Sequence, residues 1–173
     1  EVILNLYDNL IQYNGESVTD YLPMISTQVP SVENGLVSPE GTVYTFPIRE
    51  GVKFHTGNVL TPEDVKYSFH RYILGDPSGG PQWMIIEALT GGAHASVESW
   101  FEAYSGMPYS EAVDADKNVV SEEARQKLIS FYEEVVSPKV KIEGNSVVFT
   151  LDAPWGPFMN TIAHFGSWAA ITD

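Results

Sequence analysis

The pattern of apolar and polar residues between positions 42 and 73 predicts a strand followed by a helix. Tyr44, Phe46 and Ile48 stand at every second position, which is the period of a strand with one buried face. The apolar positions of the next segment follow helical spacing and are Val65, Phe69, Tyr72 and Ile73. Pro47 has no amide donor, so we expect this strand to lie at the edge of its sheet.

Residues 61–64 have the composition of a helix start. The Thr61 hydroxyl can accept a hydrogen bond from an amide of the first turn, and Pro62 stands where no amide donor is needed. Glu63 and Asp64 add negative charge at the positive end of the helix dipole. We therefore expect the helix to begin here.

Other segments predict three helices and a hairpin. The apolar spacing over residues 3–11 indicates a helix that ends near Asn14-Gly15. Residues 140–143 and 147–151 flank Gly144-Asn145, which predicts a tight hairpin. A short helix is expected from Phe158 to His164. Ser121 is expected to cap a further helix that Pro138 ends, and its apolar face consists of Ala124, Leu128, Phe131, Tyr132 and Val135.

The same segments, taken as an ordered string, resemble a family signature. The matching positions are Tyr44, Phe46, Ile48-Arg49, Glu50-Gly51-Val52, Phe54-His55, Gly57, Leu60-Thr61 and Glu63-Asp64-Val65. The string is similar to that of the peptide/nickel (oligopeptide-type) family of extracytoplasmic solute-binding proteins, which serve ABC transporters. Two further patterns of that family are matched by residues 7–10 (YDNL) and 151–158 (LDAPWGPF).

The resemblance implies a fold and a domain organisation. The expected fold class is α+β, a small and mostly antiparallel sheet with helices packed on one face, within a larger two-lobed periplasmic-binding-protein-like fold. Residues 1–173 would form a single domain, a fragment that resembles the accessory domain of the first lobe. Residues 78–137 lack family matches, and we interpret them as an insertion. It is acidic, because residues 81–137 contain ten acids and three bases.

Composition narrows the function classes. The 23 acidic and 9 basic residues give a net charge of −14, which argues against nucleic acid as a partner because phosphate binding needs clustered Lys and Arg. The absence of cysteine excludes disulfides, thiol catalysis and zinc–thiolate sites. No apolar run approaches the ~20 residues that span a bilayer.

No motif in the chain predicts catalysis, a cofactor or a metal site. The histidines at positions 55, 70, 94 and 164 have no metal-binding spacing, and the chain has no nucleophile elbow, Walker loop or dinucleotide fingerprint. Asp114, Asp116 and Asn118 have the opening spacing of a calcium loop. Val119 then replaces the required glycine, so a solvated acidic loop and a weak cation site both stay open.

The resemblance also suggests ligand-binding residues. In the family, an aromatic residue after a proline, shortly downstream of the signature helix, reaches toward the ligand. Pro81-Gln82-Trp83 resembles that placement, so Trp83 and Gln82 are the candidate ligand-binding residues. The alternative is that Trp83 packs against the signature helix.

The function implied by the resemblance is non-enzymatic capture of oligopeptides and delivery to an ABC permease. A nickel chelate or an oligosaccharide is the alternative ligand, and a purely structural or docking module is the alternative role. An extracellular hydrolase is a more distant alternative. The expected location is extracytoplasmic, with a lipid anchor on the full-length protein.

Overall fold

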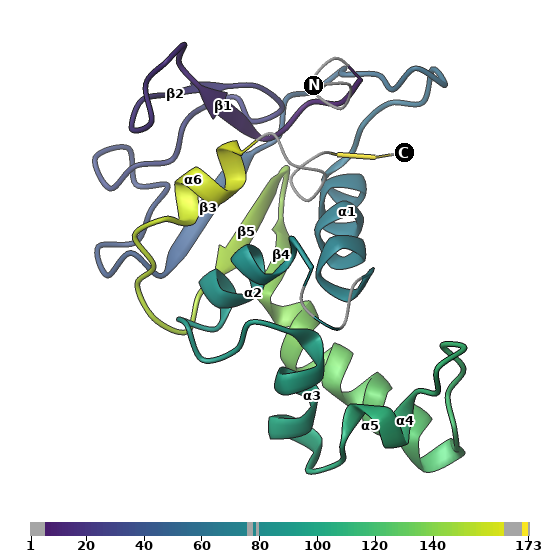
Figure 1. The fold of residues 1–173 in the computed structure, drawn as a ribbon. Helices are drawn as coiled ribbons and strands as arrows, with labels where there is room; N and C mark the ends of the chain where they lie inside the picture. Colours follow the sequence, from purple (N-terminus) through teal and green to yellow (C-terminus); the bar gives the residue numbers. More distant parts are fainter. Residues whose placement is uncertain (1–5, 76–77, 79, 165–170, 173) are drawn as a thin grey trace.

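The computed structural model describes residues 6–75, 78, 80–164 and 171–172. Its elements are, in chain order, β1 (Ile11–Tyr13), β2 (Tyr21–Pro23), β3 (Val43–Pro47), α1 (Pro62–Gly75), α2 (Trp83–Leu89), α3 (Val97–Ser105), α4 (Tyr109–Ala112), α5 (Glu122–Phe131), the π-helix η2 (Tyr132–Val136), the 3₁₀ turn η3 (Ser137–Lys139), β4 (Val140–Glu143), β5 (Ser146–Thr150) and α6 (Phe158–Ala163). Figure 1 shows the strands with α1, α2 and α6 in one body, from which α3, α4 and α5 project. No helix in the described part of the chain is long and apolar enough to cross a membrane.

The central sheet has three antiparallel strands in the order β3-β5-β4. β5 is the middle strand, and the β4–β5 hairpin turns at Gly144, whose φ is +59°. β1 and β2 form a separate antiparallel pair. The predictions of an α+β fold, of the hairpin and of an edge position for Pro47 are therefore confirmed.

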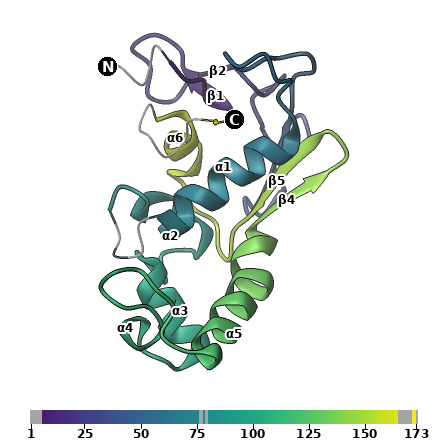
Figure 2. The ribbon, with the colours of Figure 1, turned by 90° about the vertical axis from the view of Figure 1, so that its right-hand side faces the viewer.

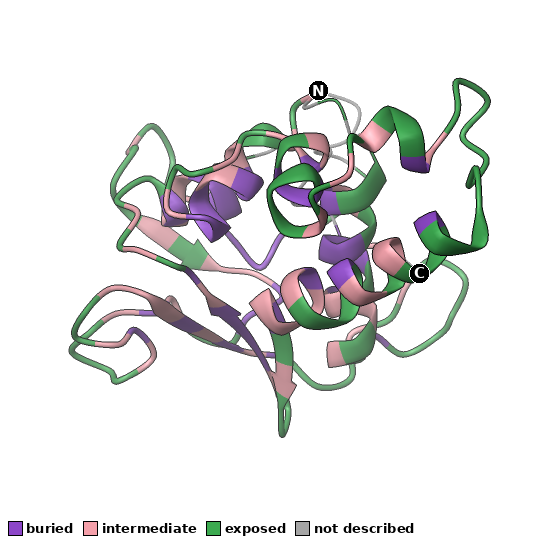
Figure 3. Cartoon of the chain, turned by 90° about the horizontal axis from the view of Figure 1, so that it is seen from below, coloured by how far each residue is buried: buried purple, intermediate pink, exposed green. Residues whose placement is uncertain are grey.

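The core is centred on Phe149 of β5, which is fully buried. Its ring lies 5.6 Å from that of Phe46 on β3, 4.8 Å from that of Phe69 on α1 and 5.5 Å from that of Phe158 on α6, measured between centroids. One side chain thus joins the sheet to two helices. Figure 3 shows the buried residues of the strands and helices in purple.

Helix α1 begins where its sequence predicts. The amide of Asp64 donates to Thr61 Oγ1 at 3.4 Å, and the amide of Thr61 donates to Asp64 Oδ2 at 2.7 Å. This reciprocal pair satisfies two donors at the helix start. Val65, Phe69 and Ile73 are buried against the sheet, as their spacing indicates.

The helix expected over residues 3–11 is wrong for the described part of that range. Residues 6–10 are not helical, and the chain enters β1 at Ile11. The carbonyl of Leu10 accepts the amides of Met24 and Ser26 at 3.1 and 3.0 Å. Pairing with this distant segment buries Leu10 and Ile11 fully, and it overrides the local helical spacing.

The projecting unit of α3, α4 and α5 has its own aromatic cluster. The buried ring of Phe131 lies 5.6 Å from Trp100, 5.6 Å from Phe101 and 5.8 Å from Tyr104. Ser121 accepts the amide of Ala124 at 3.1 Å, which confirms the predicted cap of α5. α5 then passes into the π-helix η2 before Pro138, so the expected single helix changes type.

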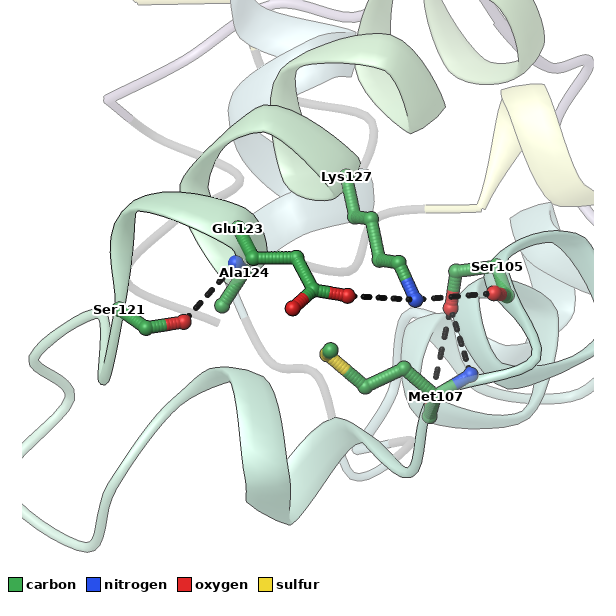
Figure 4. A network of polar contacts seen from close by, with 6 residues as sticks. All are labelled: Ser105, Met107, Ser121, Glu123, Ala124 and Lys127. Carbon is green, nitrogen blue, oxygen red and sulfur yellow. Dashed lines mark hydrogen bonds and ion pairs between the residues drawn. The ribbon is translucent and has the colours of Figure 1, made fainter.

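A polar network fastens α3 to α5 within the projecting unit (Figure 4). The ammonium of Lys127 lies 3.5 Å from the carboxylate of Glu123 and 3.4 Å from the carbonyl of Ser105, at the end of α3. The Ser105 hydroxyl in turn accepts the amide of Met107 at 3.1 Å. The network and the aromatic cluster together hold α5 in one position.

Candidate functional site

Gln82 and Trp83 lie at the beginning of α2. The carbonyl of Gln82 accepts the amides of Ile85 and Ile86 at 3.1 Å each, which fixes the first turn. Ile85 and Ile86 are buried, whereas Trp83 is 43% exposed. An exposed indole provides a flat apolar surface together with an N–H donor.

The side chain of Gln82 contains an unpaired acceptor. Its Oε1 is buried and accepts no hydrogen bond from a described residue. A buried polar atom without a partner costs about 1–3 kcal/mol. A donor that reached this atom would therefore be bound favourably.

The segment around Pro154 fixes the end of α2. The amide of Asp152 donates to the carbonyl of Leu89 at 3.1 Å. Gly91 lies directly against Ala153, and Gly92 lies against the ring of Trp155. The position of Trp83 thus depends on a segment 70 residues downstream that resembles the second family pattern.

The β1–β2 hairpin is fastened to α6 by Asn160. The hydroxyl of Tyr21 donates to Asn160 Oδ1 at 3.0 Å, and the hydroxyl of Tyr13 donates to its carbonyl at 3.2 Å. Asn160 Nδ2 donates to the carbonyl of Val18 at 2.9 Å. Burial, and secondarily the neighbouring Tyr13, raise the pKa of Tyr21. Tyr21 therefore stays protonated at neutral pH and remains a donor.

His70 and Tyr132 form a contact that our sequence analysis missed. Nδ1 of His70 on α1 lies 3.0 Å from the hydroxyl of Tyr132 on η2, and the rings meet edge to face. Nε2 is buried and has no hydrogen-bond partner among the described residues. The two residues are 62 positions apart. No local pattern could pair them, although the helical spacing of each was evident.

We expect His70 to make the fold sensitive to mild acid. Burial of the ring, and then the charge of Lys66, lower the pKa of His70 to about 4. In the unfolded chain the pKa of His70 is near 6.5, so the unfolded state takes up the proton more readily than the folded state. The stability that comes from burying neutral His70 is therefore fully present above pH 6.5 and is lost as the pH falls toward 4. From pH 7 to pH 5, this loss lowers the free energy of unfolding by roughly 1–2 kcal/mol, allowing for solvent screening.

Urea unfolding of the wild type and of His70→Phe at pH 7 and pH 5 measures this contribution. The variant should lose less stability between the two pH values than the wild type does. His55→Phe, at an exposed position, is the control and should behave like the wild type. Equal losses in the wild type and in His70→Phe would contradict the assignment.

The loop that resembles the start of a calcium site is occupied by its own backbone. Oδ1 of Asp114 accepts the amides of Asp116 at 3.0 Å and of Asn118 at 2.8 Å. These bonds, above all that from Asn118, lower the pKa of Asp114. No cluster of three or more possible His, Cys, Asp or Glu metal ligands occurs among the residues that the structure describes.

A hollow of about 740 Å³ lies between the end of α1 and the projecting unit, apart from Gln82 and Trp83. Its charged lining consists of Glu98, Glu102, Asp114 and Lys117. The carboxylate of Glu102 accepts the amide of Tyr109 at 3.0 Å, and Asp114 is engaged in its own turn. The carboxylates of Glu102 and Asp114 thus serve the local structure.

Similarity to known proteins covers most of the chain. A di/tripeptide-binding protein 2 from Pseudomonas aeruginosa (strain UCBPP-PA14) is 28% identical over 155 residues, which are 85% of this chain and 22% of the relative. Heme-binding protein A from Haemophilus influenzae (strain ATCC 51907 / DSM 11121 / KW20 / Rd) is 35% identical over 79 residues, 42% of this chain and 13% of the relative.

The fold is also found in solved structures. OppA of Listeria monocytogenes bound to peptide superposes with a TM-score of 0.61 at 18% identity, covering 99% of this chain and 26% of that one. The fold is thus that of one part of a two-lobed binding protein. The chain spans only 22% of its di/tripeptide-binding relative and 13% of its haem-binding relative.

The family is shown by a match that extends over most of the chain. The model for bacterial extracellular solute-binding proteins, family 5 Middle, matches residues 30–172. This range includes β3, α1, the projecting unit, the hairpin and α6. The chain therefore belongs to the bacterial extracellular solute-binding proteins, family 5.

Proposed function

We propose that this chain is part of the solute-binding component of an ABC importer, which captures peptides and delivers them to a membrane permease without catalysing a reaction. The observation that carries the proposal is the family match over residues 30–172, joined to the 28% identity with a di/tripeptide-binding protein. In this proposal the full-length protein is extracytoplasmic and lipid-anchored. Residues 1–173 are a single domain of it, with an acidic insertion at about 78–137.

Trp83 and Gln82 are the proposed ligand contacts. A peptide presents alternating N–H donors and C=O acceptors, and the buried Oε1 of Gln82 is an acceptor without a partner among the described residues. The exposed face of Trp83 can pack flat against an apolar or aromatic side chain of the peptide. The first turn of α2 positions both residues.

We expect the isolated chain to bind peptide with a Kd weaker than about 1 mM. Binding sites for small molecules usually enclose about 70–90% of the ligand surface, and hinge closure of two lobes provides that enclosure. Gln82 and Trp83 can cover only one side of a peptide. Isothermal titration with a mixed pool of di- to pentapeptides should give no saturable heat, and micromolar binding would contradict this expectation.

In the full-length protein, the test of the site is Trp83→Ala. Loss of the stacking surface should weaken peptide binding at least tenfold, about 1.4 kcal/mol. Tyr67→Ala is the control, because Tyr67 is an exposed aromatic residue on α1 away from Gln82 and Trp83. Equal effects of the two substitutions would remove the support for Trp83 as a ligand contact.

Haem is a second candidate ligand, favoured by the 35% identity with Heme-binding protein A. Absorbance titration of the full-length protein with hemin separates the two candidates, since haem binding shifts the Soret band. Isothermal titration calorimetry of the full-length protein tests nickel chelates and oligosaccharides. A full-length protein that unfolds cooperatively yet is stabilised by none of these solutes would favour a purely structural or docking module.

A further inference from the structure

Two helices that are distant in sequence expose apolar side chains around one shared residue, Tyr132. On α1, Tyr67 is 58% exposed and Leu74 is 37% exposed. On α5 and the start of η2, Ile129 is 38% exposed and Tyr132 is 36% exposed, and Val119 nearby is 46% exposed. We call these five residues the α1–α5 face; both helices can be followed in Figure 2.

The α1–α5 face is hollowed on both sides of Tyr132. One hollow, of about 370 Å³, is lined by Tyr67 and Leu74 and also by Tyr132. The other, of about 540 Å³, is lined by Val119 and Ile129 and again by Tyr132. Paired hollows around a tyrosine are suited to receive the apolar side chains of another protein, whereas a convex surface is not.

The face is held in place without a partner. The contact between His70 and Tyr132 joins α1 to η2 at the boundary of the two hollows. On the inner side of α5, Phe131 is packed among aromatic rings, and Lys127 is bonded to Glu123 and to the end of α3. A surface that is already ordered loses little conformational entropy on binding.

The charges around the face are opposite in sign to those of the chain. The chain has 23 acids and 9 bases, yet the side chains lining the two hollows include Arg71, Arg125 and only one carboxylate, that of Glu133. Neither arginine forms an ion pair with any other residue that the structure describes. Arginines beside exposed tyrosines are typical of interface hot spots and bind carboxylates in a bidentate manner.

We propose that the α1–α5 face docks a second protein, and that the docked segment is apolar with flanking carboxylates. The apolar side chains enter the two hollows beside Tyr132, and the carboxylates pair with Arg71 and Arg125. This role is independent of solute capture at α2. A second copy of the chain is disfavoured as the occupant because two chains of net charge −14 repel one another.

The test uses two synthetic amphipathic helical peptides that differ only in charge. Both have leucine and phenylalanine along one face; one has flanking glutamates, and in the other lysine replaces every glutamate. Titration into the ¹⁵N-labelled full-length protein should shift the amide signals of Tyr67, Leu74, Ile129 and Tyr132 with the glutamate peptide. The lysine peptide should bind at least tenfold more weakly, although the net charge of the chain favours it. Preference for the lysine peptide, or no binding of the glutamate peptide at 1 mM, would overturn the proposal.

Matched charge variants separate the local face from the overall charge. The double variant Arg71→Glu/Arg125→Glu should weaken binding of the glutamate peptide at least tenfold. Lys53→Glu/Lys141→Glu changes the net charge equally at exposed positions outside both hollows, and it should have less than a threefold effect. Equal effects of the two double variants would overturn the proposal. Self-association in sedimentation equilibrium that Arg71→Glu/Arg125→Glu abolishes would also overturn it, in favour of a second copy.

Discussion

Truncation of Phe149 to alanine is expected to destabilise the fold by about 3–5 kcal/mol. Phe149 is fully buried on the middle strand, and its ring contacts Phe46, Phe69 and Phe158 from three different elements. The substitution removes the transfer free energy of the ring, leaves a cavity and abolishes three aromatic contacts. Since domains of this size are stable by only about 5–15 kcal/mol, the loss is a large fraction of the total.

Urea unfolding followed by circular dichroism measures this effect, and the Tm should fall by roughly 10 °C. Phe149→Leu is the control, because leucine keeps much of the volume and should cost less than about 2 kcal/mol. A loss below 1 kcal/mol in Phe149→Ala would show that the surrounding helices can close the cavity. In that case the description of Phe149 as the centre of the core would be wrong.

Gly91→Ala is expected to destabilise the fold by roughly 2–4 kcal/mol, for two reasons that can be separated. Gly91 has a φ of +61°, which costs an L residue about 1–2 kcal/mol. A Cβ at this position would also lie 2.7 Å from Cβ and 3.0 Å from the backbone N of Ala153. Because the second contact is with backbone, the segment that fixes α2 would have to move.

Gly15→Ala isolates the conformational part of that cost. Gly15 has the same φ of +61°, but a Cβ there would meet nothing within 4 Å. Gly15→Ala should therefore lower the free energy of unfolding by about 1–2 kcal/mol. The additional loss in Gly91→Ala measures the cost of the steric contact with Ala153. Ala153→Gly, combined with Gly91→Ala, should recover some of that additional loss. Equal unfolding free energies for Gly91→Ala and Gly15→Ala would contradict the close approach of the two segments.

The candidate site could be located from the sequence only through a resemblance. Pro81-Gln82-Trp83 follows the signature helix in the family order, and the structure places Gln82 and Trp83 together at the start of α2. The burial of Gln82 Oε1 could not be anticipated, because it depends on how the neighbouring segments cover it. Likewise, a Gly-Gly pair such as Gly91-Gly92 favours a turn, but no local signal predicts that these residues contact Ala153 and Trp155.

The elements that the sequence alone determined are those whose signals lie within a few consecutive residues. The structure has the cap at Thr61, the alternation in β3, the turn at Gly144 and the cap at Ser121. Each of these signals lies within a few consecutive residues. The family signature lies in the same local segments. Local propensity and hydrogen bonding were sufficient there because no distant contact opposed them.

Only the tertiary structure decided the features that depend on contacts between distant segments. Residues near Leu10 are not helical, although their apolar spacing predicts a helix. Pairing with residues 24–26 instead buries Leu10 and Ile11 fully. The joining of His70 to Tyr132, and the assembly of the α1–α5 face around Tyr132, required two helices 62 positions apart to pack together. Packing across such separations is governed by shape and burial, for which neighbouring residues in the sequence carry no signal.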